Sequence, residues 1–98
     1  GNDYVSILST LHVVEEKDSA AFFTKYPNHV RNLLTMMHSC FSRKLCSLVL
    51  AGSSEADSIC NLKEILQTLE DHISICTSSM YKGGNLFLCL AKIIEIAS

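Results

Sequence analysis

The sequence of 98 residues has no apolar run near the roughly 18 residues that a membrane span needs. It holds only eight lysines and arginines, and Arg43-Lys44 is the only adjacent pair, so no basic stripe could neutralise a run of phosphates. No N-x-Ser/Thr sequon occurs, which disfavours a glycosylated secreted protein. We therefore expect neither a membrane nor a nucleic acid as a partner.

The sequence also lacks the usual motifs of metal and nucleotide sites. No Cys-x2-Cys or His-x3-His pair occurs, and Gly83-Gly84 is not followed by the Lys-Ser/Thr of a phosphate-binding loop. One pair has workable geometry, His72 and Cys76, which lie four residues apart on one helix face. Their acidic neighbours point away from Cys76, so the pair has no orienting third group. We expect no cofactor, no metal and no catalytic site. A small enzyme or metal protein that uses His72 and Cys76 is kept as an alternative, after the secreted factor described below.

Cysteine is present in an odd number, five, and all five lie in segments with helical patterns. A disulfide framework normally has an even count in a loop-rich secreted domain, so we expect a reduced, intracellular chain, cytoplasmic or nuclear. A secreted helical-bundle signalling factor with two disulfides and one spare thiol is the alternative. The positions are Cys40, Cys46, Cys60, Cys76 and Cys89.

What the sequence does contain is typical of one packed domain over residues 1–98. Hydrophobic residues make up 48% and charged residues 18%, which argues against disorder. A start at Gly1 without methionine fits a domain excised from a larger protein. No repeat of 30–45 residues is visible, but a fragment of a helical-repeat scaffold stays an alternative.

Helical periodicity and single breaker residues predict two short helices in the first 27 residues. Asp3 can cap a first helix that ends near residue 17, and its apolar side chains recur at helical spacing. Asp18 can cap a second, short helix that stops at Pro27, a residue that also suits the first turn of the next helix.

Two long helices are predicted next, at about residues 28–51 and 58–81. Gly52 should end the former, and Asp57 or Ser58 should cap the latter. The helix at 58–81 has an apolar heptad seam, and the helix before it is its natural antiparallel neighbour. The seam comprises Ile59, Leu62, Leu66, Leu69, Ile73, Cys76 and Met80.

The last predicted helix, residues 86–97, follows Gly83-Gly84, and Asn85 should cap it. Only Lys92 and Glu95 are polar between residues 86 and 97, and Leu88 lies between these two on the helical wheel. A helix that is apolar nearly all round should be enclosed by its neighbours. The expected fold is therefore all-α, a compact five-helix bundle with two long helices and a central apolar C-terminal helix.

Three residues break the amphipathic pattern and are candidate partner contacts. Ile75 lies on the polar arc of its helix, Cys60 lies at a similar angle four turns away, and Leu88 borders the polar strip of the last helix. From these residues, and because other functions are disfavoured, we expect a non-catalytic docking, scaffolding or dimerisation module of a larger intracellular protein. Its partner would be another protein that offers an amphipathic helix, or a second copy of the chain.

Overall fold

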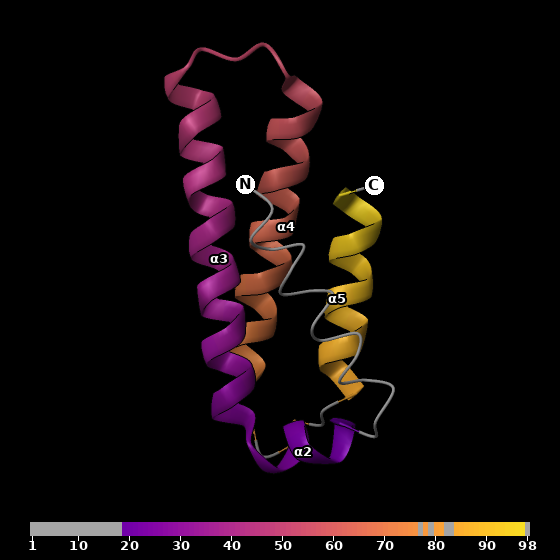
Figure 1. Cartoon of the computed structure of the whole chain (residues 1–98). Coiled ribbons are helices and arrows are strands. Elements are labelled where there is room, and N and C mark those ends of the chain that lie inside the picture. The colour runs from indigo at the N-terminus through magenta and orange to yellow at the C-terminus, as the bar shows by residue number, and fades with distance from the viewer. Residues whose placement is uncertain (1–18, 77, 79, 82–83, 98) are drawn as a thin grey trace.

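The computed structural model describes residues 19–76, 78, 80–81 and 84–97, and within these ranges it contains four α-helices and no strand (Figure 1). The helices are α2 (Ser19–Lys25), α3 (Pro27–Leu50), α4 (Ala56–Ile75) and α5 (Gly84–Ala97). The all-α class is therefore confirmed. The first of the five predicted helices, and its cap Asp3, fall in residues 1–18, outside the described residues, as does Asp18.

The boundary between α2 and α3 lies where proline predicted it. Tyr26 separates the two helices with extended φ, and Pro27 occupies the first turn of α3. Proline fits there because its missing N–H is one that the first turn leaves unused. The φ of −123° at Tyr26 lies within the range that the proline ring leaves open to the residue before it.

The turn between α3 and α4 is a Schellman motif centred on Gly52, as the sequence predicted. Gly52 has φ of 64°, its N–H donates to the Val49 carbonyl at 3.1 Å, and the Ser53 N–H donates to the Leu48 carbonyl at 3.0 Å. Glycine adopts this left-handed conformation without a Cβ penalty. The turn reverses the chain, so α3 and α4 pack side by side and antiparallel (Figure 1).

Both ends of α4 differ from the prediction. The helix starts at Ala56, and Glu55 precedes it without a side-chain cap, so the predicted cap at Asp57 or Ser58 is wrong. Asp57 instead lies in the first turn, where its negative charge interacts favourably with the positive end of the helix dipole.

The end of α4 at Ile75 comes six residues before the predicted one. The Ser74 hydroxyl donates to the Asp71 carbonyl at 2.9 Å, and the Cys76 thiol donates to the His72 carbonyl at 3.3 Å. These bonds satisfy two of the last carbonyls, and the Cys76 N–H donates to the Ile73 carbonyl three residues back at 3.2 Å, so the backbone tightens where the helix ends. Met80, predicted as the last seam residue, consequently lies beyond the helix and is 79% exposed.

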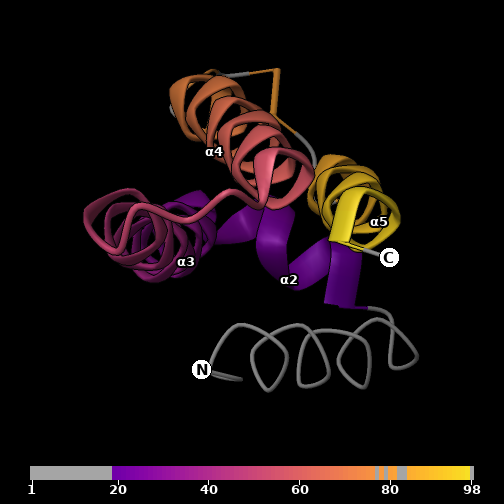
Figure 2. The same ribbon diagram turned by 90° about the horizontal axis from the view of Figure 1, so that it is seen from above.

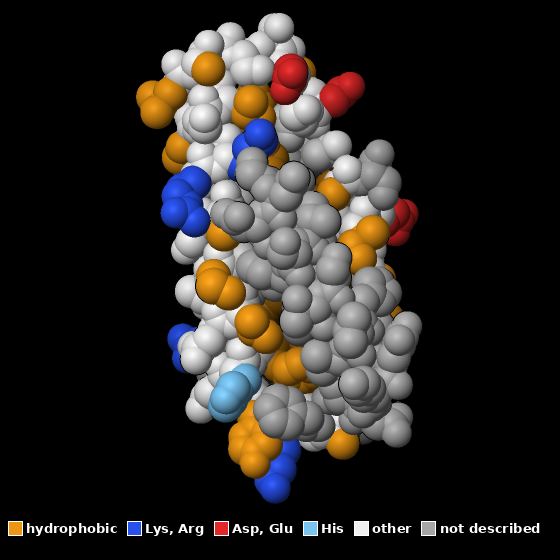
Figure 3. All heavy atoms as spheres, viewed as in Figure 1, with side chains coloured by type: hydrophobic (Ala, Val, Ile, Leu, Met, Phe, Trp, Pro, Cys, Tyr) orange, Lys and Arg blue, Asp and Glu red, His pale blue; other side chains and the backbone are white. Residues whose placement is uncertain are grey.

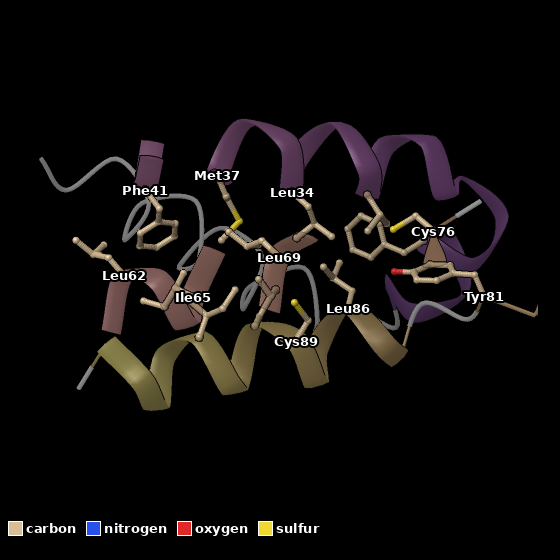
Figure 4. Packing of buried hydrophobic residues seen from close by; sticks show 14 residues of the cluster. Leu34, Met37, Phe41, Leu62, Ile65, Leu69, Cys76, Tyr81, Leu86 and Cys89 are labelled. Carbon is tan, nitrogen blue, oxygen red and sulfur yellow. The ribbon is translucent and has the colours of Figure 1, made fainter. Parts of the chain in front are cut away.

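The core runs along α4 and is filled from both sides. Figure 4 shows Leu34, Met37 and Phe41 of α3 meeting side chains of α4, with Leu86 and Cys89 of α5 below them. The buried hydrophobic residues are Phe23, Val30, Leu34, Met37, Phe41, Leu62, Ile65, Leu69, Cys76, Tyr81, Leu86, Cys89, Leu90 and Ile93.

Among the described helices, α4 and not α5 occupies the middle (Figure 2). It packs against α3 on one side and against α5 on the other, because two adjoining stripes of its surface are apolar. The prediction of a central C-terminal helix therefore differs from the arrangement seen here. Helix α5 buries Leu86, Leu90 and Ile93 but leaves Leu88 73% exposed.

The N-terminal end of α5 was also predicted wrongly. The helix begins at Gly84, so Asn85 lies within its first turn and is not its cap. Ala97 borders the same hollow as Leu62 near the start of α4, whereas Leu88 borders one with Ile75 at the end of α4. Helix α5 therefore runs antiparallel to α4.

Charges of both signs are spread over the visible face. Figure 3 shows basic side chains along α3 and acidic ones near the start of α4 and on α5. Across the α3–α4 contact, His38 Nε2 lies 3.4 Å from Glu70 Oε1.

Candidate functional site

Two of the three predicted contact residues, Ile75 and Leu88, lie together in the structure. They border a hollow of about 410 Å³ between α4 and α5. Both are exposed, Ile75 by 44% and Leu88 by 73%. We call this hollow the α4–α5 groove; its lining residues are Thr68, Asp71, His72, Ile75, Asn85, Leu88, Cys89 and Lys92.

The groove arises from two antiparallel helices whose facing side chains recur every three or four residues. On α4 these are Thr68, His72 and Ile75; on α5 they are Asn85, Leu88 and Lys92. Side chains at this spacing share one helix face, so each helix contributes one wall. Both helices also bury the adjoining face in the core, which fixes the position of each wall.

The floor of the groove contains His72, the one buried polar side chain of the described residues, with 8% of its surface exposed. Its Nε2 lies 3.5 Å from the Tyr81 hydroxyl, and the two rings meet edge to face with centroids 5.7 Å apart. Burial lowers the pKa of His72 from its usual 6.5, because the charged imidazolium is disfavoured away from water. The imidazole is therefore neutral at pH 7.

The Tyr81 ring connects the segment after α4 to the core. Figure 4 shows it next to Cys76, with its hydroxyl directed into the cluster. Burial raises the pKa of Tyr81 far above its usual 10, and the nearby Cys76 thiol adds to this effect. The phenol stays protonated and acts as a hydrogen-bonding packing residue.

Two buried thiols lie close to the groove floor, and neither is set up as a nucleophile. Burial raises the pKa of Cys76, and burial together with the neighbouring Cys76 raises that of Cys89 to about 12. A thiol is nucleophilic as thiolate, so the raised pKa disfavours the reactive form of both thiols. They serve as small apolar side chains of the core.

The His72–Cys76 pair does not have the geometry of a catalytic or metal-binding pair. The thiol donates to the main-chain carbonyl of His72, and the imidazole Nε2 faces Tyr81. Within the described ranges, no three His, Cys, Asp or Glu side chains converge as metal ligands. The arrangement favours a packing role for both residues.

The rim of the groove carries one charge of each sign, on opposite helices. Asp71 on α4 accepts a 2.8 Å hydrogen bond from Gln67 Nε2 one turn earlier. Lys92 on α5 lies near enough to Cys89 for its positive charge to lower the pKa of that thiol, although burial outweighs it. Asp71 and Lys92 are both exposed.

Cys60, the third predicted contact residue, lies elsewhere. It is exposed near the start of α4, where a hollow of about 300 Å³ is bordered by Ser53, Ser54, Ile59 and Lys63. It shares no lining residue with the α4–α5 groove. The structure therefore groups Ile75 with Leu88 and separates both from Cys60.

No match is found. Neither the models of known protein families, nor the curated proteins, nor the solved structures gave a match to this chain. None of the described helices combines the length and hydrophobicity needed to cross a bilayer.

Sequence reasoning missed the polar part of the groove, namely Thr68, Asp71, Asn85 and Lys92. A signal for it is present on α4. Besides the predicted seam, a second line of steps of three and four runs through Leu62, Ile65, Leu69, His72 and Cys76, all of which are buried. Two overlapping stripes indicate two neighbouring helices, and the second neighbour, α5, forms the groove.

Proposed function

We propose that this chain is a non-catalytic protein–protein interaction module of a larger intracellular protein, and that the α4–α5 groove is its docking surface. The single observation that carries the proposal is the pair Ile75 and Leu88, exposed on the two walls of one groove. Apolar side chains exposed together beside a hollow mark interaction sites more often than scattered ones do.

The walls and floor support this function in different ways. The walls supply the apolar side chains of Ile75 and Leu88, which lose water on binding, while the floor of His72 and Cys89 is already buried in the free chain and so adds little desolvation cost. Asp71 and Lys92 on the rim can fix orientation. A helix packed along the groove would complete the environment that α4 and α5 leave open.

The intracellular compartment is part of the proposal. All five cysteines are unpaired in the structure, which supports a reducing environment. A fifth helix is also part of the proposal. The sequence predicts it within residues 1–18, outside the residues that the structure describes.

The test is affinity capture with the tagged chain, comparing the wild type with Leu88→Asp and Ile75→Asp. Both side chains are exposed, so the variants should keep the helical circular dichroism spectrum. The matched control is Leu50→Asp, because Leu50 is also an exposed leucine, 88% accessible, but lies at the far end of α3. We expect both groove variants to lose the same partners, and Leu50→Asp to retain them. Retention of every partner by folded Leu88→Asp would contradict the proposal.

A further inference from the structure

We propose that the occupant of the α4–α5 groove is a second copy of this chain, which lays its own α4 and α5 across the groove in a two-fold symmetric dimer. This inference rests on the proposed function, because it names the partner of the same surface. It is carried by the arrangement of apolar and charged residues on the two walls.

The apolar residues of the two walls can contact those of a second copy that is related by two-fold symmetry. Ile75 and Leu88 lie on opposite walls of the groove, one on α4 and one on α5. A two-fold axis running along the groove places α4 of one copy over α5 of the other. Because each contact of such an interface occurs twice, Ile75 meets Leu88 of the second copy in both halves.

The charges on the rim match in the same way. Asp71 lies one turn before Ile75 on the α4 wall, and Lys92 lies one turn after Leu88 on the α5 wall. Because the two helices are antiparallel, both charges are displaced in the same direction along the groove. The operation that pairs Ile75 with Leu88 also faces the Asp71 carboxylate with the Lys92 ammonium of the second copy, again twice. The other simple symmetry, with the axis across the helices, would lay α4 on α4 and α5 on α5, so Asp71 of one copy would not face Lys92 of the other. Charge complementarity therefore selects the axis along the groove.

The helices themselves suit this assembly. Helix α5 has 14 residues and α4 has 20, so the shorter helix can lie along its counterpart for about 21 Å. Because α4 and α5 are antiparallel within one chain, α4 is also antiparallel to the α5 that it meets in the second copy. The interface is then an antiparallel four-helix layer, a common packing of amphipathic helices.

The test is sedimentation equilibrium of the full chain at low salt, from about 10 μM to about 1 mM, with charge-reversal variants. The wild type should associate to a dimer. Asp71→Lys places two like-charged pairs in the interface, and so does Lys92→Asp, so each single variant should dissociate about tenfold more readily. Both positions are exposed, so the fold should persist, as circular dichroism will show.

An equimolar mixture of the two variants gives the decisive measurement. In a mixed dimer, the introduced lysine faces the introduced aspartate, and the native Asp71 faces the native Lys92. The mixture should therefore recover wild-type association, which neither variant shows alone. Leu50→Asp, remote from the groove, should leave association unchanged.

Three results would overturn the homodimer: a wild type that stays monomeric over the whole range, single variants that dimerise as well as the wild type, or a mixture that fails to recover. A monomeric wild type whose captured partners are lost only with Leu88→Asp would leave the proposed function standing and remove the second copy as occupant. Loss of neither association nor partners with Leu88→Asp would remove both.

Discussion

At the residue scale, His72 is a titratable side chain that is buried in the fold. It lies under the groove, stacks edge to face on Tyr81, and is kept neutral by burial. A neutral imidazole can fill this site because the Tyr81 hydroxyl is within reach of Nε2, so one polar atom of the ring has a partner. Protonation would instead place a charge in the core.

We expect this burial to make stability depend on pH. The unfolded chain takes up a proton on His72 near pH 6.5, whereas the folded chain, with its lowered pKa, does so only at lower pH. The free energy of unfolding is therefore not reduced by His72 above about pH 6.5. It decreases as the pH falls from there through the pKa that His72 has in the folded chain. The loss cannot exceed about 1.4 kcal/mol per pH unit for one proton. Urea unfolding between pH 8 and pH 5 measures it.

The variant His72→Gln removes the titration, so its free energy of unfolding should fall less steeply with acid than that of the wild type. His29→Gln is the matched control, because His29 is an exposed histidine of α3. Its slope shows what the loss of a histidine outside the core does on its own. Equal slopes for the wild type and His72→Gln would show that His72 is not the group responsible.

At the element scale, the turn from α3 to α4 depends on one backbone conformation. Gly52 has φ of 64°, and a Cβ added there would meet no atom within 4 Å. Space is therefore available, and the cost of a side chain comes from the backbone alone. This separates conformational strain from steric overlap.

We expect Gly52→Ala to lower the free energy of unfolding by roughly 1 kcal/mol, because an L-residue in this conformation costs about 1–2 kcal/mol and a stiffer unfolded chain returns part of that. Gly52→Asn should cost less, since asparagine tolerates left-handed backbone. Chemical denaturation of the three proteins gives the comparison. An alanine variant as stable as the wild type would mean that the turn changes conformation.

The elements show which parts of a helix its sequence determines. Pro27 restricts its own backbone and Gly52 alone tolerates the left-handed conformation of the turn without a Cβ penalty, so the start and end of α3 were predictable within a residue. The end of α4 was not, because the apolar seam continues in the sequence to Met80 while the backbone leaves the helix after Ile75. Periodicity reports which face is apolar and not where the backbone leaves the helix.

At the scale of the whole molecule, the five cysteines differ in solvent exposure, from exposed to buried. Cys46 and Cys60 are exposed, Cys40 is partly buried, and Cys76 and Cys89 are in the core. With a pKa of about 12, the Cys89 thiol is ionised in roughly one molecule in ten thousand at pH 8. Thiol chemistry therefore reports on tertiary structure directly.

We expect the native chain to show two fast-reacting thiols, Cys46 and Cys60, with Cys76 and Cys89 at least about a hundredfold slower. Alkylation followed by peptide mass spectrometry assigns the order. Cys46→Ser with Cys60→Ser should remove the fast phase. Labelling of Cys89 before Cys60 would contradict the fold. In denaturant without reductant, five titratable thiols would support the intracellular proposal, and one would support the secreted alternative.

The sequence alone determined the helical class and the two ends of α3, at Pro27 and Gly52. It also identified Ile75 and Leu88 as the apolar residues that break the amphipathic pattern. These follow from the conformational limits of single residues and from periodicity, which are local properties. Only the tertiary structure decided that α4 lies between α3 and α5, that Ile75 and Leu88 border one groove, and that Cys60 lies apart from them. The physical reason is that a broad apolar arc can pack in several ways, and the choice depends on how all helices fill the core together.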